Sequence, residues 1–258
     1  MGFKEKWHAA VARKNSLLCV GIDPADDGQR RANTLARGED KLAFCLSVIE
    51  KVSPYAAAIK PNRQYIRDFS RKEMLALTSK IHELGMVAID DSKIADIGDT
   101  NDAAFYHSKA EGYDAITYAP FPGNIAAAAE AAQKRDLGLI TLVLMSNPEF
   151  LVMKNAKIEG QKGSFYFAGE VKRAQGEGIV LGAPSEKNHI TDADMEGIKE
   201  ILDDQLILVP GIGAQGGSAK SLIEAFGSRI IANVGRDIFY AKDPAKVAKS
   251  YQQILIPS

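Results

Sequence analysis

Three charged residues, Asp91, Lys93 and Asp96, lie within six positions of one another after the apolar run Met86–Ile89. Side chains alternate between the two faces of a strand, so Asp91 and Lys93 are predicted to share a face, while Asp90 points toward the other. Opposite charges about 4 Å apart attract by about 4 kcal/mol at an effective dielectric near 20. A lysine held between carboxylates can stabilise charge that develops on a substrate, or deliver a proton to it.

Two further charged residues end other apolar runs: Asp23 follows Leu17–Ile22, and Lys60 follows Ala56–Ile59. If these runs are neighbouring parallel strands, their carboxyl ends bring Asp23 and Lys60 to the same mouth as Asp91 and Lys93. Salt bridges that only satisfy one another are the structural alternative. Lysine and aspartate are rarely buried unless paired, and their concentration at strand ends favours a catalytic interpretation.

A glycine-rich segment, Pro210-Gly-Ile-Gly213-Ala-Gln215-Gly-Gly, follows the seventh apolar run, and Gly235-Arg236 follows the eighth. Glycines allow backbone N–H groups to approach an anion closely, and the arginine fork matches phosphate oxygens. Gln215 is a further neutral donor. These residues predict a phosphate site; glycines that serve only a tight turn are the structural alternative.

The same glycines also spell G-x-G-x-x-G at Gly211, Gly213 and Gly216, the pattern of a dinucleotide-binding fold. That fingerprint belongs at the first strand–helix turn, with an acidic residue about 20 positions further on. Here the pattern follows the seventh apolar run, and the residue twenty positions beyond Gly216 is Arg236. The dinucleotide interpretation is therefore disfavoured.

Eight apolar runs alternate with segments of helical period, which is the inventory of a closed (β/α)8 TIM barrel with one extra N-terminal helix, Lys4–Arg13. An open doubly wound sheet is the alternative. The predicted strands are Ser16–Asp23, Ala57–Pro61, Met86–Lys93, Ala115–Ala119, Gly138–Met145, Gly178–Ala183, Gln205–Pro210 and Arg229–Gly235. Predicted helices between them include Asp40–Val52, Arg71–Leu84 and Asn124–Arg135. One long irregular connection is expected at Ser146–Ser164, and residues 1–258 are expected to form a single catalytic domain.

The composition is that of an ordinary globular protein, with 258 residues, 46% hydrophobic residues and a formal net charge of −1. Near-neutrality gives no reason to expect nucleic acid as a partner, and the chain has no long apolar stretch that predicts a membrane span. The N-terminus lacks the apolar core of a signal peptide, and Cys19 and Cys45 are expected to be buried reduced thiols. We therefore expect a cytoplasmic protein.

Together these motifs resemble the orotidine 5'-monophosphate decarboxylase family. The segment Asp91-Ser-Lys93-Ile-Ala-Asp96-Ile looks like that family's D-x-K-x-x-D-I signature, and the segments 210–217 and 233–236 are similar to its phosphate loop and phosphate arginine. Asp23, Lys60 and Ser146-Asn-Pro-Glu match in order and placement. D-x-K-x-x-D alone is shared with related barrel decarboxylases and aldolases, whereas the combination is specific.

The resemblance implies decarboxylation of orotidine 5'-monophosphate to UMP in pyrimidine biosynthesis, without a cofactor. It implies that Lys93 is the proton donor to C6 of the pyrimidine, that Asp91 opposes the substrate carboxylate, and that Lys60 and Asp23 bind ribose hydroxyls. The pyrimidine contact would be Ser146. The phosphate site implied by the resemblance comprises Pro210, Gly213, Gln215, Gly235 and Arg236.

The resemblance further implies a homodimer in which Asp96, Ile97 and Thr100 reach into the neighbouring protomer's site. This chain departs from the family here, because Gly98-Asp99 stands where many relatives carry Pro-Asn. The departure leaves the local turn open.

Two other functions remain as alternatives. One is a metal-dependent sugar-phosphate decarboxylase or aldolase of the same barrel family, and the other is a non-catalytic phosphate-binding barrel. The four histidines, His8, His82, His107 and His189, are far apart in the sequence and predict no metal site.

Overall fold

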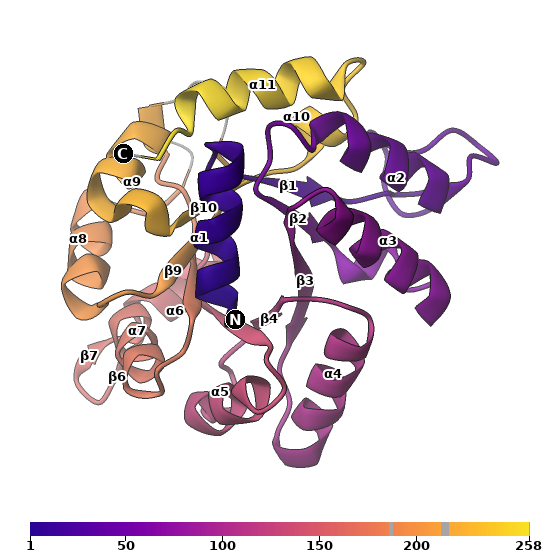
Figure 1. Cartoon of the computed structure of the whole chain (residues 1–258). Helices are drawn as coiled ribbons and strands as arrows, with labels where there is room; N and C mark the ends of the chain where they lie inside the picture. The colour runs from indigo at the N-terminus through magenta and orange to yellow at the C-terminus, as the bar shows by residue number, and fades with distance from the viewer. Residues whose placement is uncertain (186–187, 213–216, 258) are drawn as a thin grey trace.

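A closed barrel of parallel strands forms the centre of the molecule (Figure 1). The structure is a computed structural model that describes residues 1–185, 188–212 and 217–257. Among these residues the strands follow the order β1-β10-β9-β8-β5-β4-β3-β2 around the barrel. Their bounds are β1 Leu18–Ile22, β2 Ala58–Pro61, β3 Val87–Ile94, β4 Ala115–Tyr118, β5 Gly138–Leu144, β8 Gly178–Leu181, β9 Leu206–Pro210 and β10 Ile230–Val234. The predicted (β/α)8 barrel is confirmed, and each observed strand lies within or nearly within its predicted run.

Helices surround the barrel because the strands are apolar on both faces and need cover on the outside (Figure 1). The helices are α1 Phe3–Lys14, α2 Lys41–Val52, α3 Arg71–Glu83, α4 Gly98–Ala110, α5 Ile125–Gln133, α6 Leu151–Asn155, α7 Gly163–Arg173, α8 Asp192–Ile201, α9 Gly217–Phe226, α10 Arg236–Phe239 and α11 Pro244–Ile254. Short 3-10 turns occupy Arg63–Tyr65, Pro148–Phe150 and Gly227–Arg229. Side-chain caps fix several helix starts; Ser70 and Glu73, for example, form a reciprocal capping box at α3.

The extra helix α1 covers the end of the barrel where the strands begin (Figure 1). Its Trp7 is fully buried and donates a hydrogen bond to the carbonyl of Ser228, just before β10. Gly138, the first residue of β5, lies so close to Phe3 that a Cβ there would be 2.7 Å from the Phe3 ring. This end of the barrel is therefore closed, which leaves the C-terminal strand ends for a site.

A buried carboxylate fastens α1 to the barrel. Asp114, which precedes β4 and is 4% exposed, accepts hydrogen bonds from Lys6 Nζ at 2.7 Å, His82 Nε2 at 2.8 Å and the Ala88 N–H at 2.9 Å. Burial alone would raise the pKa of Asp114, but the donors from His82, Ala88 and Lys6 outweigh it and lower the pKa below its usual value.

We expect Asp114→Asn to lower the free energy of unfolding by about 2 kcal/mol at pH 7, because an amide cannot accept from three donors, two of them cationic or able to become so. Since the folded pKa lies below the unfolded value of about 3.9, the stabilisation is complete above that value and is lost as the pH falls through the folded pKa. Urea unfolding from pH 7 to pH 3 should therefore show the difference between variant and parent shrinking below about pH 4.

Asp204→Asn is the matched control for this measurement, because Asp204 also pairs with a lysine of α1, Lys4, at 2.8 Å but has a side chain that is 72% exposed. Exposed pairs contribute little, so this variant should unfold like the parent. Equal losses in both variants would show that burial of Asp114 has no special role.

The segment predicted as one irregular connection, Ser146–Ser164, is more ordered than the sequence indicated. It contains the 3-10 turn Pro148–Phe150, helix α6 and a small antiparallel hairpin of β6 Lys157–Ile158 and β7 Gln161–Lys162. Each strand of the hairpin has two residues, which is too short to produce an alternating pattern. The prediction of an irregular loop was wrong for this reason.

No helix in the described part of the chain is both long and apolar enough to cross a membrane. Cys19 and Cys45 are free and buried, as expected from their apolar surroundings.

Candidate active site

Asp91 lies at the centre of a charge cluster at the C-terminal ends of β2 and β3. Its Oδ2 accepts a hydrogen bond from Lys60 Nζ, and its Oδ1 accepts one from Lys93 Nζ. Lys60 and Asp91 are each 6% exposed, whereas the Lys93 side chain is 42% exposed. The sequence prediction that these three residues meet is confirmed, and Lys93 is the member that solvent or a ligand can reach.

The contact between Asp91 and Lys93 depends on a bulge that the sequence did not predict. The register between β3 and β4 shifts between Asp90 and Ile94, and Lys93 adopts a left-handed φ of 50°. Such a conformation costs a non-glycine residue about 1 kcal/mol or more, so the neighbours must impose it. Thr117 of β4 does so, because its Oγ1 accepts a hydrogen bond from the Lys93 N–H at 2.9 Å and lies 3.2 Å from Asp91 Oδ1.

Electrostatics keep the Lys60–Asp91 pair ionised. Burial alone would lower the pKa of Lys60, but the charge of Asp91 and its hydrogen bond raise it above the ordinary value. Burial alone would likewise raise the pKa of Asp91, but the charges of Lys60 and Lys93 hold that pKa far below its ordinary value. Asp91 is therefore an anion throughout the physiological range, and the cluster needs no rearrangement to present a charged lysine.

Asp90 points into the helix layer, as the alternation of β3 predicts. Arg63 donates to Asp90 Oδ1 at 3.2 Å and to Oδ2 at 2.6 Å, and it also contacts Glu111 at 2.6 Å. Because this carboxylate is 1% exposed and fully paired, its role is structural.

Asp23 follows β1 and is held by an aromatic and cationic cluster. The Tyr240 hydroxyl donates to the Asp23 carbonyl at 2.8 Å and accepts from the Ala25 N–H at 2.9 Å. The Arg30 guanidinium lies 5.3 Å from the ring centroids of both Tyr65 and Tyr240, and 4.0 Å from Asp23 Oδ2. Strand β1 pairs with β2 in the register Gly21 with Lys60, which places Asp23 at the same end of the barrel as the cluster.

A cavity of about 280 Å³ opens where β1, β9 and β10 end. It is lined by Asp23, Gly211, Ile212, Asn233, Val234, Gly235, Arg236 and Asp237. Arg236 is exposed at the first position of α10, and it makes no ion pair with any other residue that the structure describes. Pro210 ends β9 and pairs in register with Asn233 of β10. The predicted residues Gly213 and Gln215 lie outside the described residues.

Ser146 lies just after β5 and is half-buried. It approaches Gly182 of the adjacent β8 loop so closely that a Cβ at Gly182 would be 2.8 Å from the Ser146 Cβ. Only glycine fits at position 182, and this close approach fixes Ser146 at the rim of the barrel.

A family model described as "Orotidine 5'-phosphate decarboxylase / HUMPS family" matches residues 16–251. The chain belongs to this family. It is 30% identical to orotidine 5'-phosphate decarboxylase of Dechloromonas aromatica, over 99% of this chain and 96% of that protein. It is 31% identical to the enzyme of the same name from Cupriavidus necator, over 97% and 94% of the two chains. The OMP decarboxylase structure of Leishmania donovani superposes with a TM-score of 0.79 at 26% identity, covering 99% of this chain and 97% of that one.

The residues that follow Lys93, from Asp96 to Thr100, lie away from the charge cluster. Asp96, Ile97 and Thr100 are exposed, and no contact joins them to Asp91 or Lys93 within the described residues of this chain. Gly98 has a φ of 49°, whereas proline is confined to a φ near about −65°. A proline at position 98 could not adopt the backbone seen here.

Sequence reasoning missed Thr117, Arg30 and Tyr240, each of which contacts a predicted site residue. Thr117 is a buried hydroxyl within the apolar strand Ala115–Tyr118, and that exception to the pattern was its available signal. Arg30 and Tyr240 lie more than 200 positions apart, so no local pattern could pair them.

Proposed function

We propose that this chain decarboxylates orotidine 5'-monophosphate to UMP, without a cofactor, within a single catalytic domain over residues 1–258. The observation that supports this most directly is the pairing of Asp91 with both Lys60 and Lys93 at the mouth of the barrel. The names of the full-length relatives support the same reaction. The product assigns the enzyme to pyrimidine nucleotide biosynthesis.

In the proposed reaction the C6 carboxylate of the substrate lies beside Asp91 and Lys93. The bond between C6 and the carboxyl carbon breaks, carbon dioxide leaves, and the electron pair remains on C6. Lys93 Nζ–H then gives its proton to C6, either as the bond breaks or directly afterwards, which yields UMP and a neutral lysine that regains a proton from water. The fixed ammonium stabilises the charge that develops on C6, and Asp91 opposes the ground-state carboxylate.

The phosphate and ribose are proposed to lie across the cavity beside Asp23 and Arg236. Asp23 and Lys60 would bind the ribose hydroxyls, and Ser146 the pyrimidine. Pro210, Gly213, Gln215, Gly235 and Arg236 would enclose the phosphate. Binding energy from the phosphate, remote from the reacting carbon, is then available to hold the carboxylate against Asp91.

Arg236→Ala is expected to raise KM for orotidine 5'-monophosphate by roughly tenfold to a hundredfold, because a charged hydrogen bond contributes about 1.5–3 kcal/mol. Arg236→Lys, which keeps the charge but lacks the planar fork, should recover part of the loss. Arg173→Ala is the matched control, because Arg173 lies on α7 beside residues of α1 at the closed end of the barrel and pairs there with Glu170. An unchanged KM in Arg236→Ala would show that the substrate phosphate does not bind in this cavity.

The proposal includes a homodimer in which Asp96, Ile97 and Thr100 enter the partner's site. Large apolar side chains are exposed on the connections that follow β3, β4 and β5, with Ile97 62%, Phe121 87% and Val152 of α6 76% exposed. Apolar side chains gathered on one rim indicate a protein contact surface.

A cytoplasmic location is part of the proposal, supported by the two buried free thiols.

Loss of orotidine absorbance, followed with the purified chain, tests the reaction. We expect turnover to persist after treatment with a chelator, whereas a sugar-phosphate decarboxylase of the metal-dependent type would lose its activity. Both oxygens of Asp91 already face lysine ammonium groups, which favours the charge cluster over a metal ligand. Absence of turnover with wild-type chain that still binds UMP would instead support a non-catalytic phosphate-binding barrel.

A further inference from the structure

The backbone N–H and carbonyl of Asp96 are both held by one buried side chain of α4. The Asp96 N–H donates to Asn101 Oδ1 at 3.1 Å, and Asn101 Nδ2 donates back to the Asp96 carbonyl. Asn101 is 2% exposed, although it lies only four residues into a helix whose first turn is otherwise largely exposed. A carboxamide carries an N–H donor and a carbonyl acceptor side by side, so one asparagine can bind the backbone N–H and the carbonyl of the same residue together.

A second asparagine, at the start of α5, also binds the Asp96 carbonyl. Asn124, which precedes α5, donates through Nδ2 to the Asp96 carbonyl at 3.2 Å, and its Oδ1 accepts a hydrogen bond from the Tyr118 hydroxyl at the end of β4. Asp96 therefore has its backbone tied to α4, to α5 and, through Asn124, to the barrel. Its own carboxylate is turned by a hydrogen bond from the Ile97 N–H to Oδ1 at 2.9 Å.

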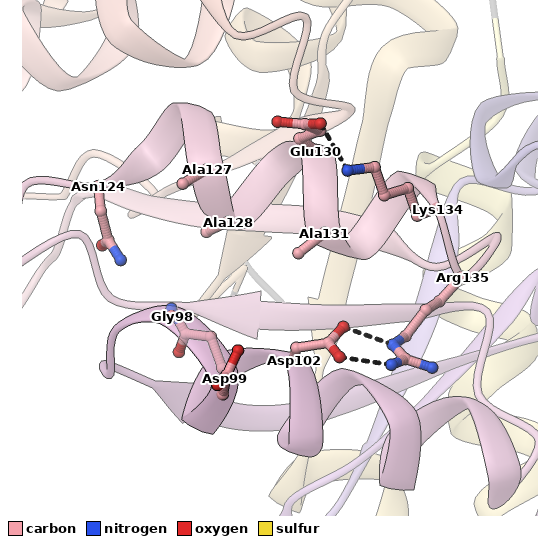
Figure 2. A pocket seen from close by; sticks show the side chains of 11 residues that line it. Gly98, Asp99, Asp102, Asn124, Ala127, Ala128, Glu130, Ala131, Lys134 and Arg135 are labelled. Carbon is pink, nitrogen blue, oxygen red and sulfur yellow. Dashed lines mark hydrogen bonds and ion pairs between the residues drawn. The ribbon is translucent and has the colours of Figure 1, made fainter.

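Little apolar packing supports this segment from behind. A cavity of about 500 Å³ separates the first turn of α4 from α5, with Gly98, Asp99 and Asp102 on one wall and a row of alanines, Ala127, Ala128 and Ala131, on the other (Figure 2). The contact that bridges the cavity in Figure 2 is the paired hydrogen bond from Arg135 to Asp102, at 2.7 Å and 2.5 Å, on a partly exposed part of α4. Hydrogen bonds, rather than side-chain packing, therefore determine where Asp96 lies.

We infer that Asn101 is a positioning residue, whose paired hydrogen bonds to the Asp96 backbone hold that carboxylate at the place where it acts. The inference rests on the proposed function, in which Asp96 completes an active site. A displacement of about 1 Å at a catalytic group can reduce the rate by about a hundredfold, and loss of both bonds frees the segment to move by such an amount.

The test is a double-mutant cycle on the purified dimer. Asn101→Ala should lower kcat for orotidine 5'-monophosphate by roughly 10- to 100-fold, with KM changed by less than about threefold. Asp96→Asn should lower kcat as well. When Asn101→Ala is added to Asp96→Asn, kcat should fall by no further factor, because a residue that acts only through Asp96 has nothing left to position.

Arg135→Ala is the matched control, since it removes the ion pair to Asp102 and the contact with the Tyr106 ring on α4 without touching Asp96. Its kcat should stay within about threefold of the parent, because a partly exposed ion pair contributes little. Asn124→Ala, which removes one donor from the Asp96 carbonyl, should lower kcat by a smaller factor and should also have no effect on top of Asp96→Asn. This variant decides the question if Asn101→Ala does not fold.

The possible results distinguish failure of the proposed reaction from failure of the positioning role of Asn101. If the wild-type chain has no activity on orotidine 5'-monophosphate, the proposed function itself is wrong. An active wild type with an unchanged kcat in Asn101→Ala, or with effects of Asn101→Ala and Asp96→Asn that multiply, overturns the positioning role alone. An equal loss in Arg135→Ala would assign the effect to general loosening of α4, which also overturns it.

Discussion

Lys93→Ala is expected to abolish turnover, lowering kcat by at least about 10⁴-fold, while UMP still binds. The variant removes the proton donor and the cation that faces the developing charge at C6, and each such role is commonly associated with a factor of about 10² or more. The phosphate cavity beside Arg236 lies on other strands and stays intact. Loss of UMP binding with turnover per bound substrate unchanged would contradict the assignment.

The fold should survive this substitution. Asp91 keeps its buried hydrogen bond from Lys60, so no uncompensated charge is left in the barrel. Because position 93 has a φ of 50°, Lys93→Gly should be more stable than Lys93→Ala by about 1 kcal/mol, although both are inactive. Urea unfolding of the two variants measures the difference. Lys109→Ala, near the end of α4 with a bond to the carbonyl of Asp136, is the control that should keep full activity.

The sequence carried enough information for the barrel because every strand is a nearly continuous apolar run, which a parallel strand buried on both faces requires. It also placed Asp90 in the helix layer correctly, since β3 alternates regularly up to Asp91. Simple alternation ended there. The left-handed backbone at Lys93 is imposed by Thr117 on the neighbouring strand, and such a constraint exists only after β3 and β4 have paired.

Other parts of the site depend on contacts between residues far apart in the sequence. The Arg30 guanidinium beside Asp23 also contacts the rings of Tyr65 and Tyr240, which come from two distant segments. The hydrogen bonds that hold the Asp96 backbone likewise come from two separate segments, through Asn101 and Asn124. A single asparagine in a helix gives no periodic signal, so these supports could be found only in three dimensions.

The exposure of Asp96 within one chain leads to the second prediction, which concerns subunit complementation. If Asp96 serves the partner's Lys93, then Lys93→Ala and Asp96→Ala homodimers are both expected to be inactive, because each contains only defective sites. Mixing the two after reversible dissociation should restore activity. In a heterodimer one site combines both defects, and the other combines an intact Lys93 with an intact Asp96.

Random exchange of equal amounts makes about half of the dimers mixed, and each mixed dimer has one intact site of two, so the activity should return to roughly a quarter of the wild-type value per site. The mixture of Lys93→Ala with Asp91→Ala is the control, because both residues serve the same site and every heterodimer site is then defective. Recovery in the first mixture alone would place Asp96 across the interface. If neither mixture recovers although exchange is demonstrated by tagged subunits, Asp96 acts within its own chain or not at all, and the exposed rim of Ile97, Phe121 and Val152 needs another partner.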